Sequence, residues 1–298
     1  DRRFFKRAVR ADVTVLSSIP LGEDELPGNK KLAEELSHLG EIGSLFIPSE
    51  DEIDELKAAA ASCSDDLFAA TAKTKLESAA AICEKLSRRF TCTVANPPYM
   101  GSSSFNPFMS KWVKKHYPDV KSDLCTCFIE RGFSLAMDRG YAAMVTMQSW
   151  MFLSSFEKLR TSLLENYHIE NMLHLGPRTF DELSGEVVQN TSFVVAKNKS
   201  DEGGVYFRLV DGKNCAEKKD MFLQALQEHT AKVYYPNVPQ SNFEKIPGCP
   251  IGYWVSPNIL KIFTSNLALS AVCSPTQGLA TADNARFLRS WFEGSRSR

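Results

Sequence analysis

The chain has 298 residues, of which 43% are hydrophobic and 24% charged, and its 35 Lys and Arg are balanced by 36 Asp and Glu. This composition is typical of a globular protein with room for one large α/β domain and a smaller module, and it excludes a fibre, a disordered chain and a protein that binds nucleic acid by net charge alone. No stretch reaches the roughly eighteen apolar residues of a membrane span, and we expect a cytoplasmic protein. The eight cysteines form no CxxC pair, so we expect no metal site.

The first ninety residues predict mainly helices. We expect a short strand over Asp12–Ile19, followed by a helix in which leucines recur at helical spacing up to a stop at Gly40. Ser49 and Glu52 have the spacing of a capping box, which predicts the start of a second helix.

From Thr91 onward the pattern alternates between strands and helices, which is typical of βαβ units and a mixed, mostly parallel sheet. Strands are predicted over 91–95, 141–147 and 169–175. Helices are predicted from Asn106, over 122–139, and from Ser154. The fold class is therefore α/β.

The last third of the chain predicts a hairpin and then a change of composition. The segments 187–197 and 203–212 can pair as an antiparallel hairpin across a polar turn. Beyond about residue 235, Pro and Gly recur every few residues, as in a linker or the rim of a second module. We expect a helical segment over 1–90, an α/β core over 91–235, and a linker with the beginning of another module over 236–298.

The stretch "VANPPY" ends the first of these strands with Asn96, two prolines and Tyr99. The carboxyl ends of parallel strands are where open α/β sheets bind ligands. Neither Pro97 nor Pro98 has an N–H, so this stiff loop offers hydrogen-bond acceptors. The Asn96 side-chain oxygen and the Pro97 carbonyl could each accept one N–H of an aromatic amine, while Tyr99 could stack on its ring. Proline pairs also close ordinary strands, and tyrosine is often a packing residue.

The motif resembles the catalytic motif of S-adenosylmethionine-dependent amino-methyltransferases that methylate adenine N6 in DNA. The stretches "SDLCTCFIERGFSLAMDRGYAAMVTMQSWMFLSSFEKLR" and "PTQGLATADNARFLR" resemble the PglX methyltransferases of BREX phage-defence systems, and more distantly the fused type II restriction and modification enzymes. The resemblance covers most of the chain from about residue 90. It implies a Rossmann-like class I methyltransferase domain, here partial, followed by the start of a target-recognition module.

The resemblance also implies roles for single residues. Asn96 and Pro97 would accept the target amine, Tyr99 would stack on the base, and Pro98 would shape the loop. Phe180 matches, less closely, the aromatic on the other face of a flipped base, and a core phenylalanine is an equal alternative. Double-stranded DNA and other phage-defence proteins are the partners that the resemblance implies.

One feature of the family is missing from the sequence. The glycine-rich turn and the acidic residue that bind S-adenosylmethionine would lie before the catalytic motif, and neither is found there. Gly40 and Gly43 are the only close glycine pair upstream, and they follow a helix. We therefore expect the cofactor motif to lie upstream of a fragment that binds the cofactor weakly or not at all.

Two other functions compete with DNA adenine methylation. Enzymes that methylate glutamine in release factors also use an Asn-Pro-Pro-Tyr loop, but they end soon after the last strands of the domain, whereas about a hundred residues follow here. The second alternative is a DNA-binding or defence-complex scaffold that has kept the fold and lost the chemistry.

Overall fold

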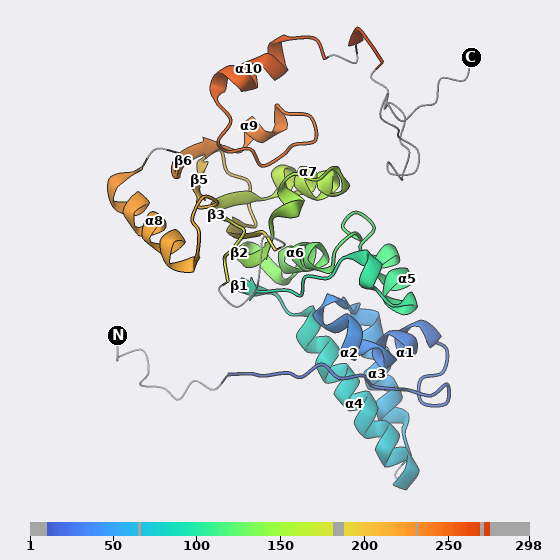
Figure 1. Cartoon of the computed structure of the whole chain (residues 1–298). Coiled ribbons are helices and arrows are strands. Elements are labelled where there is room, and N and C mark those ends of the chain that lie inside the picture. The colour runs from blue at the N-terminus through green and yellow to red at the C-terminus, as the bar shows by residue number, and fades with distance from the viewer. Residues whose placement is uncertain (1–10, 65–66, 181–187, 231, 269–270, 275–298) are drawn as a thin grey trace, which may run out of the picture. The chain divides into compact units, whose positions relative to one another are not determined.

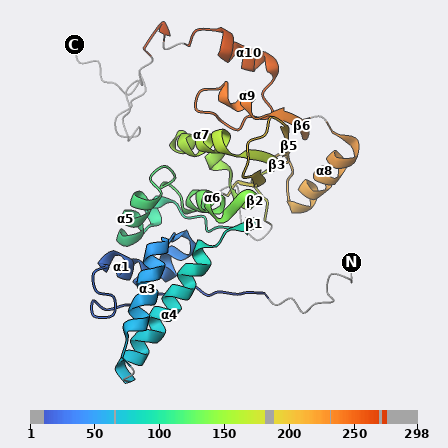
Figure 2. The same cartoon turned by 180° about the vertical axis from the view of Figure 1, so that it is seen from behind.

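The computed structural model describes residues 11–64, 67–180, 188–230, 232–268 and 271–274 (Figures 1 and 2). The contacts within the chain divide it into two compact units, residues 1–254 and 255–298. The second unit contains helix α10 (Pro257–Ser265). Everything else described below belongs to the first unit. The domain boundaries expected at 90 and 235 stay predictions.

The first unit begins with a helical segment. It contains α1 (Lys30–Ser37), α2 (Leu39–Ile42), the 3₁₀ turn η2 (Gly43–Leu45), α3 (Glu50–Ser62) and α4 (Leu67–Ser87). The expected strand over Asp12–Ile19 is wrong, because these residues have no partner strand and Val13 and Val15 are largely exposed. The expected stop at Gly40 is also wrong, since Gly40 lies inside α2.

The capping box at the start of α3 is confirmed. The Ser49 hydroxyl accepts a bond from the Glu52 N–H at 3.2 Å, and the Glu52 carboxylate accepts one from the Ser49 N–H at 2.9 Å. Both bonds satisfy N–H groups that the first turn of a helix leaves without partners.

Replacing Ser49 with alanine should therefore lower the free energy of unfolding by about 1 kcal/mol. Chemical denaturation measures the change. Ser62→Ala, at the opposite end of the same helix, is the matched control and should cost less, because the Ser62 hydroxyl only donates to the Ala59 carbonyl of its own helix. Equal losses from the two changes would show that the capping box does not stabilise α3.

A six-stranded sheet follows the helical segment. Its strands are β1 (Phe90–Ala95), β2 (Ala136–Met147), β3 (His168–Gly176), β4 (Asn190–Ala196), β5 (Gly203–Arg208) and β6 (Tyr234–Pro239). They lie in the order β1-β2-β4-β3-β5-β6. β1 is parallel to β2 and β3 is parallel to β5, while β4 is antiparallel to both β2 and β3, and β6 is antiparallel to β5. The expected mixed α/β sheet of the Rossmann-like class is confirmed, with four of these six strands running in one direction.

The expected hairpin between 187–197 and 203–212 is wrong. β4 pairs with β2 and β3, whereas β5 lies on the far side of β3. The physical reason is that five of the seven residues of β4 are buried, and the buried backbone N–H and C=O groups of such a strand need hydrogen-bond partners along both of its edges. The two segments are adjacent in sequence, but β3 separates them in the sheet.

Helices connect and cover the strands. They are α5 (Pro107–His116), α6 (Leu124–Leu135), α7 (Glu157–Asn166), α8 (Cys215–Glu228) and α9 (Ser241–Glu244). Asn106 caps α5 as expected, but α7 begins at Glu157 without a cap from Ser154, and α6 ends at Leu135 instead of reaching 139. The residues after Leu135 belong to β2, which pairs with β1 and β4.

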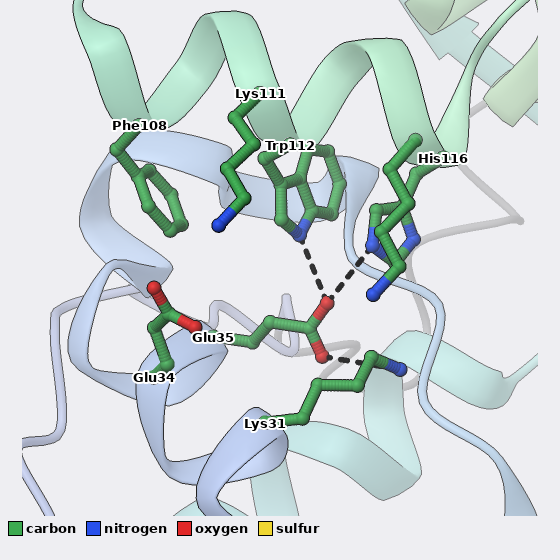
Figure 3. A pocket seen from close by; sticks show the side chains of 8 residues that line it. Lys31, Glu34, Glu35, Phe108, Lys111, Trp112 and His116 are labelled. Atoms are coloured by element: carbon green, nitrogen blue, oxygen red, sulfur yellow. Dashed lines mark hydrogen bonds and ion pairs between the residues drawn. The ribbon is translucent and has the colours of Figure 1, made fainter.

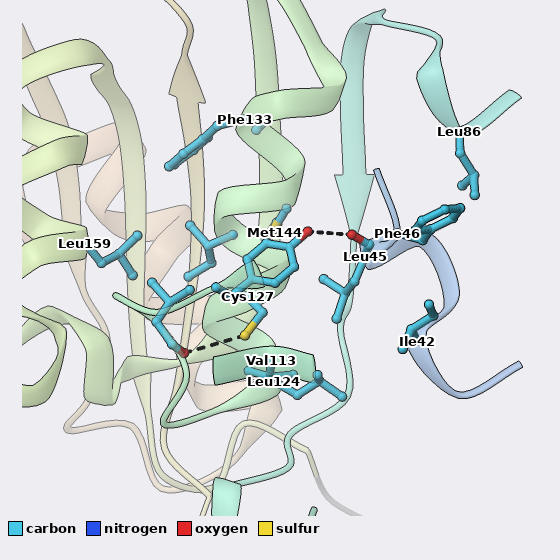
Figure 4. Packing of buried hydrophobic residues seen from close by; sticks show 14 of the residues in the cluster. Ile42, Leu45, Phe46, Leu86, Val113, Leu124, Cys127, Phe133, Met144 and Leu159 are labelled. Atoms are coloured by element: carbon cyan, nitrogen blue, oxygen red, sulfur yellow. Dashed lines mark hydrogen bonds between the residues drawn. The ribbon is translucent and has the colours of Figure 1, made fainter. Parts of the chain in front are cut away.

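One hydrophobic core joins the helical segment to the sheet. Figure 4 shows Leu45 and Phe46 in the same cluster as Phe133 on α6 and Met144 on β2. The Tyr117 hydroxyl donates a hydrogen bond to the Leu45 carbonyl at 2.6 Å inside this core. The helical segment therefore packs against the layer that carries the motif.

Candidate functional site

The loop Asn96–Tyr99 begins at the carboxyl end of β1, beside the parallel strand β2. Pro97 is buried, Asn96 and Pro98 are exposed, and Tyr99 is half-buried. A buried proline in this position anchors the loop without needing a backbone donor partner. The Asn96 side chain is thereby left at the surface, where a ligand can reach its oxygen.

The Tyr99 hydroxyl lies at the centre of the site. It accepts a hydrogen bond from Asn190 Nδ2 at 3.0 Å. Its own proton can be donated to Asn96 Oδ1 or to the Val145 carbonyl, each 3.4 Å away. Burial raises the pKa of Tyr99 above its usual value, so the hydroxyl keeps its proton at neutral pH. The site thus contains a neutral aromatic ring that is held by its hydroxyl.

Backbone hydrogen bonds hold the Gly-Ser tract that follows Tyr99. The Leu124 N–H donates to the Met100 carbonyl at 2.9 Å, and the Ser102 N–H donates to the Ser122 carbonyl at 3.0 Å. Gly101 also forms an isolated bridge with Asp123, whose carboxylate caps the start of α6. The loop is therefore tied at one end to β1 and at the other to α6.

A second group of polar side chains lies near the same edge of the sheet, where β2 and β3 end and β4 begins. Buried His174 contacts the Tyr253 hydroxyl through Nδ1 at 3.0 Å and Gln148 Oε1 through Nε2 at 2.7 Å. Gln148 Nε2 in turn donates to Gln189 Oε1. Burial, with the nearby charges of Arg208 and Lys218, lowers the pKa of His174 to about 4. His174 is therefore neutral at pH 7 and ties residue 253 to the end of β3.

This pKa predicts a pH dependence of stability. Because the pKa is about 4 in the folded chain and about 6.5 in an unfolded one, only the unfolded state binds a proton at His174 as the pH falls below 6.5. Stability is therefore complete above pH 6.5 and decreases toward pH 4. Denaturation at pH 7 and pH 5 should give free energies of unfolding that differ by about 2 kcal/mol from this residue.

His174→Gln should reduce that difference. His229, which is exposed at the end of α8, provides the matched control variant His229→Gln. If the two variants show the same pH dependence as the parent, His174 does not carry the effect.

A small cavity lies away from the motif, between α1 and α5. Its volume is about 80 Å³, and it is lined by Lys31, Glu35, Trp112 and His116 among others (Figure 3). Buried Glu35 accepts a bond from Trp112 Nε1 at 3.0 Å and lies 3.1 Å from His116 Nε2. Burial lowers the pKa of His116. These contacts join the helical segment to the helix that follows the motif, and we interpret them as a structural anchor.

Phe180 does not join the site as the structure describes it. Its side chain is 39% exposed, and it immediately precedes residues 181–187, which lie outside the described residues. Among the described rings, Phe180 and Tyr99 make no stacking contact. Its role against the second face of a base stays a prediction.

Sequence reasoning missed Asn190, Thr146 and the Val145 carbonyl. β4 brings Asn190 next to Tyr99 although ninety-one positions separate them in the sequence. A weak signal was present, because asparagine is depleted in strands and here precedes the predicted strand residues Phe193–Ala196 by three positions. The sequence does not reveal the partner, which depends on the insertion of β4 beside β2.

The described residues do not fit a cradle for the nucleoside of S-adenosylmethionine. No strand precedes β1 in the described ranges 11–64 and 67–89, so no glycine-rich turn follows one. Gly40 lies in α2, and Gly43 begins η2 with a positive φ of 55°. The free edge of β1 carries Val94, which is 79% exposed.

Two absences concern the described part of the chain. It contains no group of three or more His, Cys, Asp or Glu that could hold a metal ion. It also contains no helix long and apolar enough to cross a membrane.

Comparison with known sequences identifies relatives. The sequence model of the Eco57I restriction-modification methylase family matches residues 30–180. The adenine-specific methyltransferase PglX of Lacticaseibacillus casei (strain Zhang) is 46% identical over 211 residues, which are 70% of this chain and 17% of the relative. The adenine-specific methyltransferase BrxX of Escherichia coli O9:H4 (strain HS) is 42% identical over 212 residues, with the same two coverages of 70% and 17%. The chain thus spans less than a fifth of the length of these relatives.

Solved structures with a similar arrangement also exist. A protein of a type I restriction-modification complex has a TM-score of 0.43 and 16% identity, with 63% of this chain and 42% of that chain covered. A modification subunit of a putative type I restriction enzyme from Vibrio vulnificus YJ016 has a TM-score of 0.39 and 12% identity, with coverages of 65% and 49%.

Proposed function

Because the chain belongs to the Eco57I restriction-modification methylase family, we propose that it carries the base-binding part of a site-specific DNA methyltransferase that methylates adenine at N6. The observation that carries this proposal is the loop Asn96–Tyr99 at the carboxyl end of β1, with the Tyr99 hydroxyl held by Asn190. Two curated relatives named as adenine-specific methyltransferases support adenine as the target.

The proposed chemistry depends on hydrogen-bond acceptors for the adenine amino group more than on a general base. The lone pair of the adenine amino group is delocalised into the ring, so the nitrogen is a poor nucleophile. Asn96 Oδ1 and the Pro97 carbonyl would each accept one N6–H and draw that lone pair back onto nitrogen. Their contribution would be orientation and electrostatic preorganisation.

Stacking would hold the target ring. An adenine inside a duplex must leave the base stack before its amine can reach Asn96, and enzymes of this kind hold the flipped base between flat side chains. Tyr99 would supply one face and Phe180 the other. Pro98, exposed between the acceptors and the tyrosine, would shape the loop.

S-adenosylmethionine is the methyl donor of this family in general. We propose that its binding motif lies outside the described residues, and that the chain by itself binds the cofactor weakly. Titration calorimetry on this chain should accordingly show no tight binding of S-adenosylmethionine, and tight binding would contradict this part of the proposal.

Double-stranded DNA is the proposed partner, within a phage-defence system of the BREX type that includes other proteins. The cytoplasm is the proposed location, because it holds the DNA substrate.

The product of the reaction tests the proposed function. The full-length protein would be incubated with plasmid DNA and isotopically methyl-labelled S-adenosylmethionine, and the DNA would be digested to nucleosides for mass spectrometry. We expect label in N6-methyladenine. Label on cytosine would contradict the target, and label on a release-factor glutamine would support the competing methyltransferase. A protein that binds DNA and cofactor without transferring label would be a scaffold.

A further inference from the structure

Asn190 is an unusual residue for its place in the fold. It opens β4, where it pairs with Met147 of β2 and Gly176 of β3, and it is completely buried. Asparagine is depleted in strands, and a buried amide is costly unless it forms hydrogen bonds. The rest of β4 is mostly apolar, so stability alone does not account for an amide at this position.

The two N–H groups of the Asn190 amide are both used. Nδ2 donates to the Tyr99 hydroxyl at 3.0 Å and to the Thr146 carbonyl at 3.4 Å. The reverse amide orientation would set Oδ1 against the Thr146 carbonyl oxygen, so the donor side faces Tyr99. Oδ1 is buried without a hydrogen-bond partner among the described residues. A buried acceptor without a partner lowers stability. The amide of Asn190 is therefore present at a cost in stability, and its two donated bonds are what it contributes to the site.

The Tyr99 hydroxyl has one proton and two possible acceptors for it. Asn96 Oδ1 and the Val145 carbonyl are both 3.4 Å away. A single hydroxyl proton can serve only one of them at a time. When the Tyr99 hydroxyl donates to Asn96 Oδ1, it uses one lone pair of the oxygen that the proposed function assigns to the target amine. When the hydroxyl donates to the Val145 carbonyl instead, Asn96 Oδ1 keeps both lone pairs for that amine.

We propose that Asn190 is the positioning residue for Tyr99. Its donated bond holds the phenolic oxygen in place while the Tyr99 O–H, which keeps its proton, turns its hydrogen bond from Asn96 Oδ1 to the Val145 carbonyl. Asn96 Oδ1 can then accept a hydrogen bond from the incoming amine, and the ring keeps its stacking orientation. Asn190 acts through Tyr99 and does not touch the base. This inference rests on the proposed function.

A double-mutant cycle in the full-length protein tests the inference. Asn190→Leu keeps the side-chain size and removes both donors, and Tyr99→Phe removes the hydroxyl but keeps the ring. Each change should lower kcat for adenine methylation about tenfold, which is the effect of one hydrogen bond lost in the transition state. KM for the cofactor should not change. The double variant should be no slower than the single ones, because both changes remove the same contact.

Thr191→Val is the matched control. Thr191 is buried in the same strand, and its hydroxyl donates to the Leu173 carbonyl at 3.2 Å, away from Tyr99. This variant should lose stability without coupling to Tyr99→Phe.

The outcomes separate this inference from the proposed function. A wild-type protein that does not methylate adenine would overturn the proposed function and the inference with it. An active wild type would overturn the inference alone if Asn190→Leu kept full turnover, or if its loss simply multiplied with that of Tyr99→Phe, as a general structural defect would.

Discussion

Replacing Asn96 with alanine should lower the turnover of adenine methylation about 10² to 10³-fold in the full-length protein. Removal of one preorganised hydrogen-bonding group from a polar transition state has an effect of this size. The folded state should be little affected, because Asn96 is exposed and its oxygen contacts the Tyr99 hydroxyl only at 3.4 Å. Steady-state kinetics with DNA as the varied substrate would measure the effect, and thermal unfolding would verify the fold.

Asn166→Ala is the control for the Asn96 substitution. Asn166 is also exposed, and its amide only donates to the Ser162 carbonyl of its own helix. The control should methylate like the parent. If Asn96→Ala also methylated like the parent, the proposed role of Asn96 would be wrong.

Replacing Arg131 with alanine should lower the free energy of unfolding by about 3 to 5 kcal/mol. The Arg131 guanidinium is buried on α6 and donates through Nε to the Ser44 carbonyl at 2.6 Å and through Nη2 to the Leu86 carbonyl at 2.7 Å. Both carbonyls belong to the helical segment, so truncation would leave them without this donor and open a cavity. Without the Arg131 side chain, the packing of the helical segment against the sheet should be weaker.

Urea denaturation of the chain would measure this effect. Arg88→Ala is the matched control, because Arg88 is exposed and lies 3.6 Å from exposed Asp12, a surface pair whose loss should cost less than about 1 kcal/mol. Equal losses from the two variants would show that the buried bonds of Arg131 do not join the helical segment to the sheet.

Local signals in the sequence predicted much of the fold. The capping box at Ser49, the Asn106 cap and the strands at 91–95, 141–147 and 169–175 are all confirmed. Each depends on hydrogen bonds or apolar spacing within a few residues. The hairpin prediction was wrong because closeness in the sequence does not indicate which strand lies between two others in the sheet. β4 has a hydrogen-bonded neighbour on each edge, β2 and β3, and so does not pair with β5.

The sequence likewise predicts one part of the candidate site and not the other. The loop Asn96–Tyr99 could be found from residue types and its position after a strand. The residues that hold Tyr99 could not be found in this way, since Val145 reaches it through the pairing of β1 with β2 and Asn190 through the pairing of β2 with β4. The one hint in the sequence was an asparagine within a predicted strand, where this residue is uncommon.

Photo-crosslinking of the target base tests the central claim most directly. DNA carrying 5-iodouracil in place of the target adenine, at the position identified from the methylated product, would be irradiated with the full-length protein, and the linked peptide would be sequenced. The account predicts a crosslink to Tyr99, because the flipped ring stacks on it. A crosslink only to residues outside the loop Asn96–Tyr99 and Phe180 would contradict the claim that this loop holds the target base.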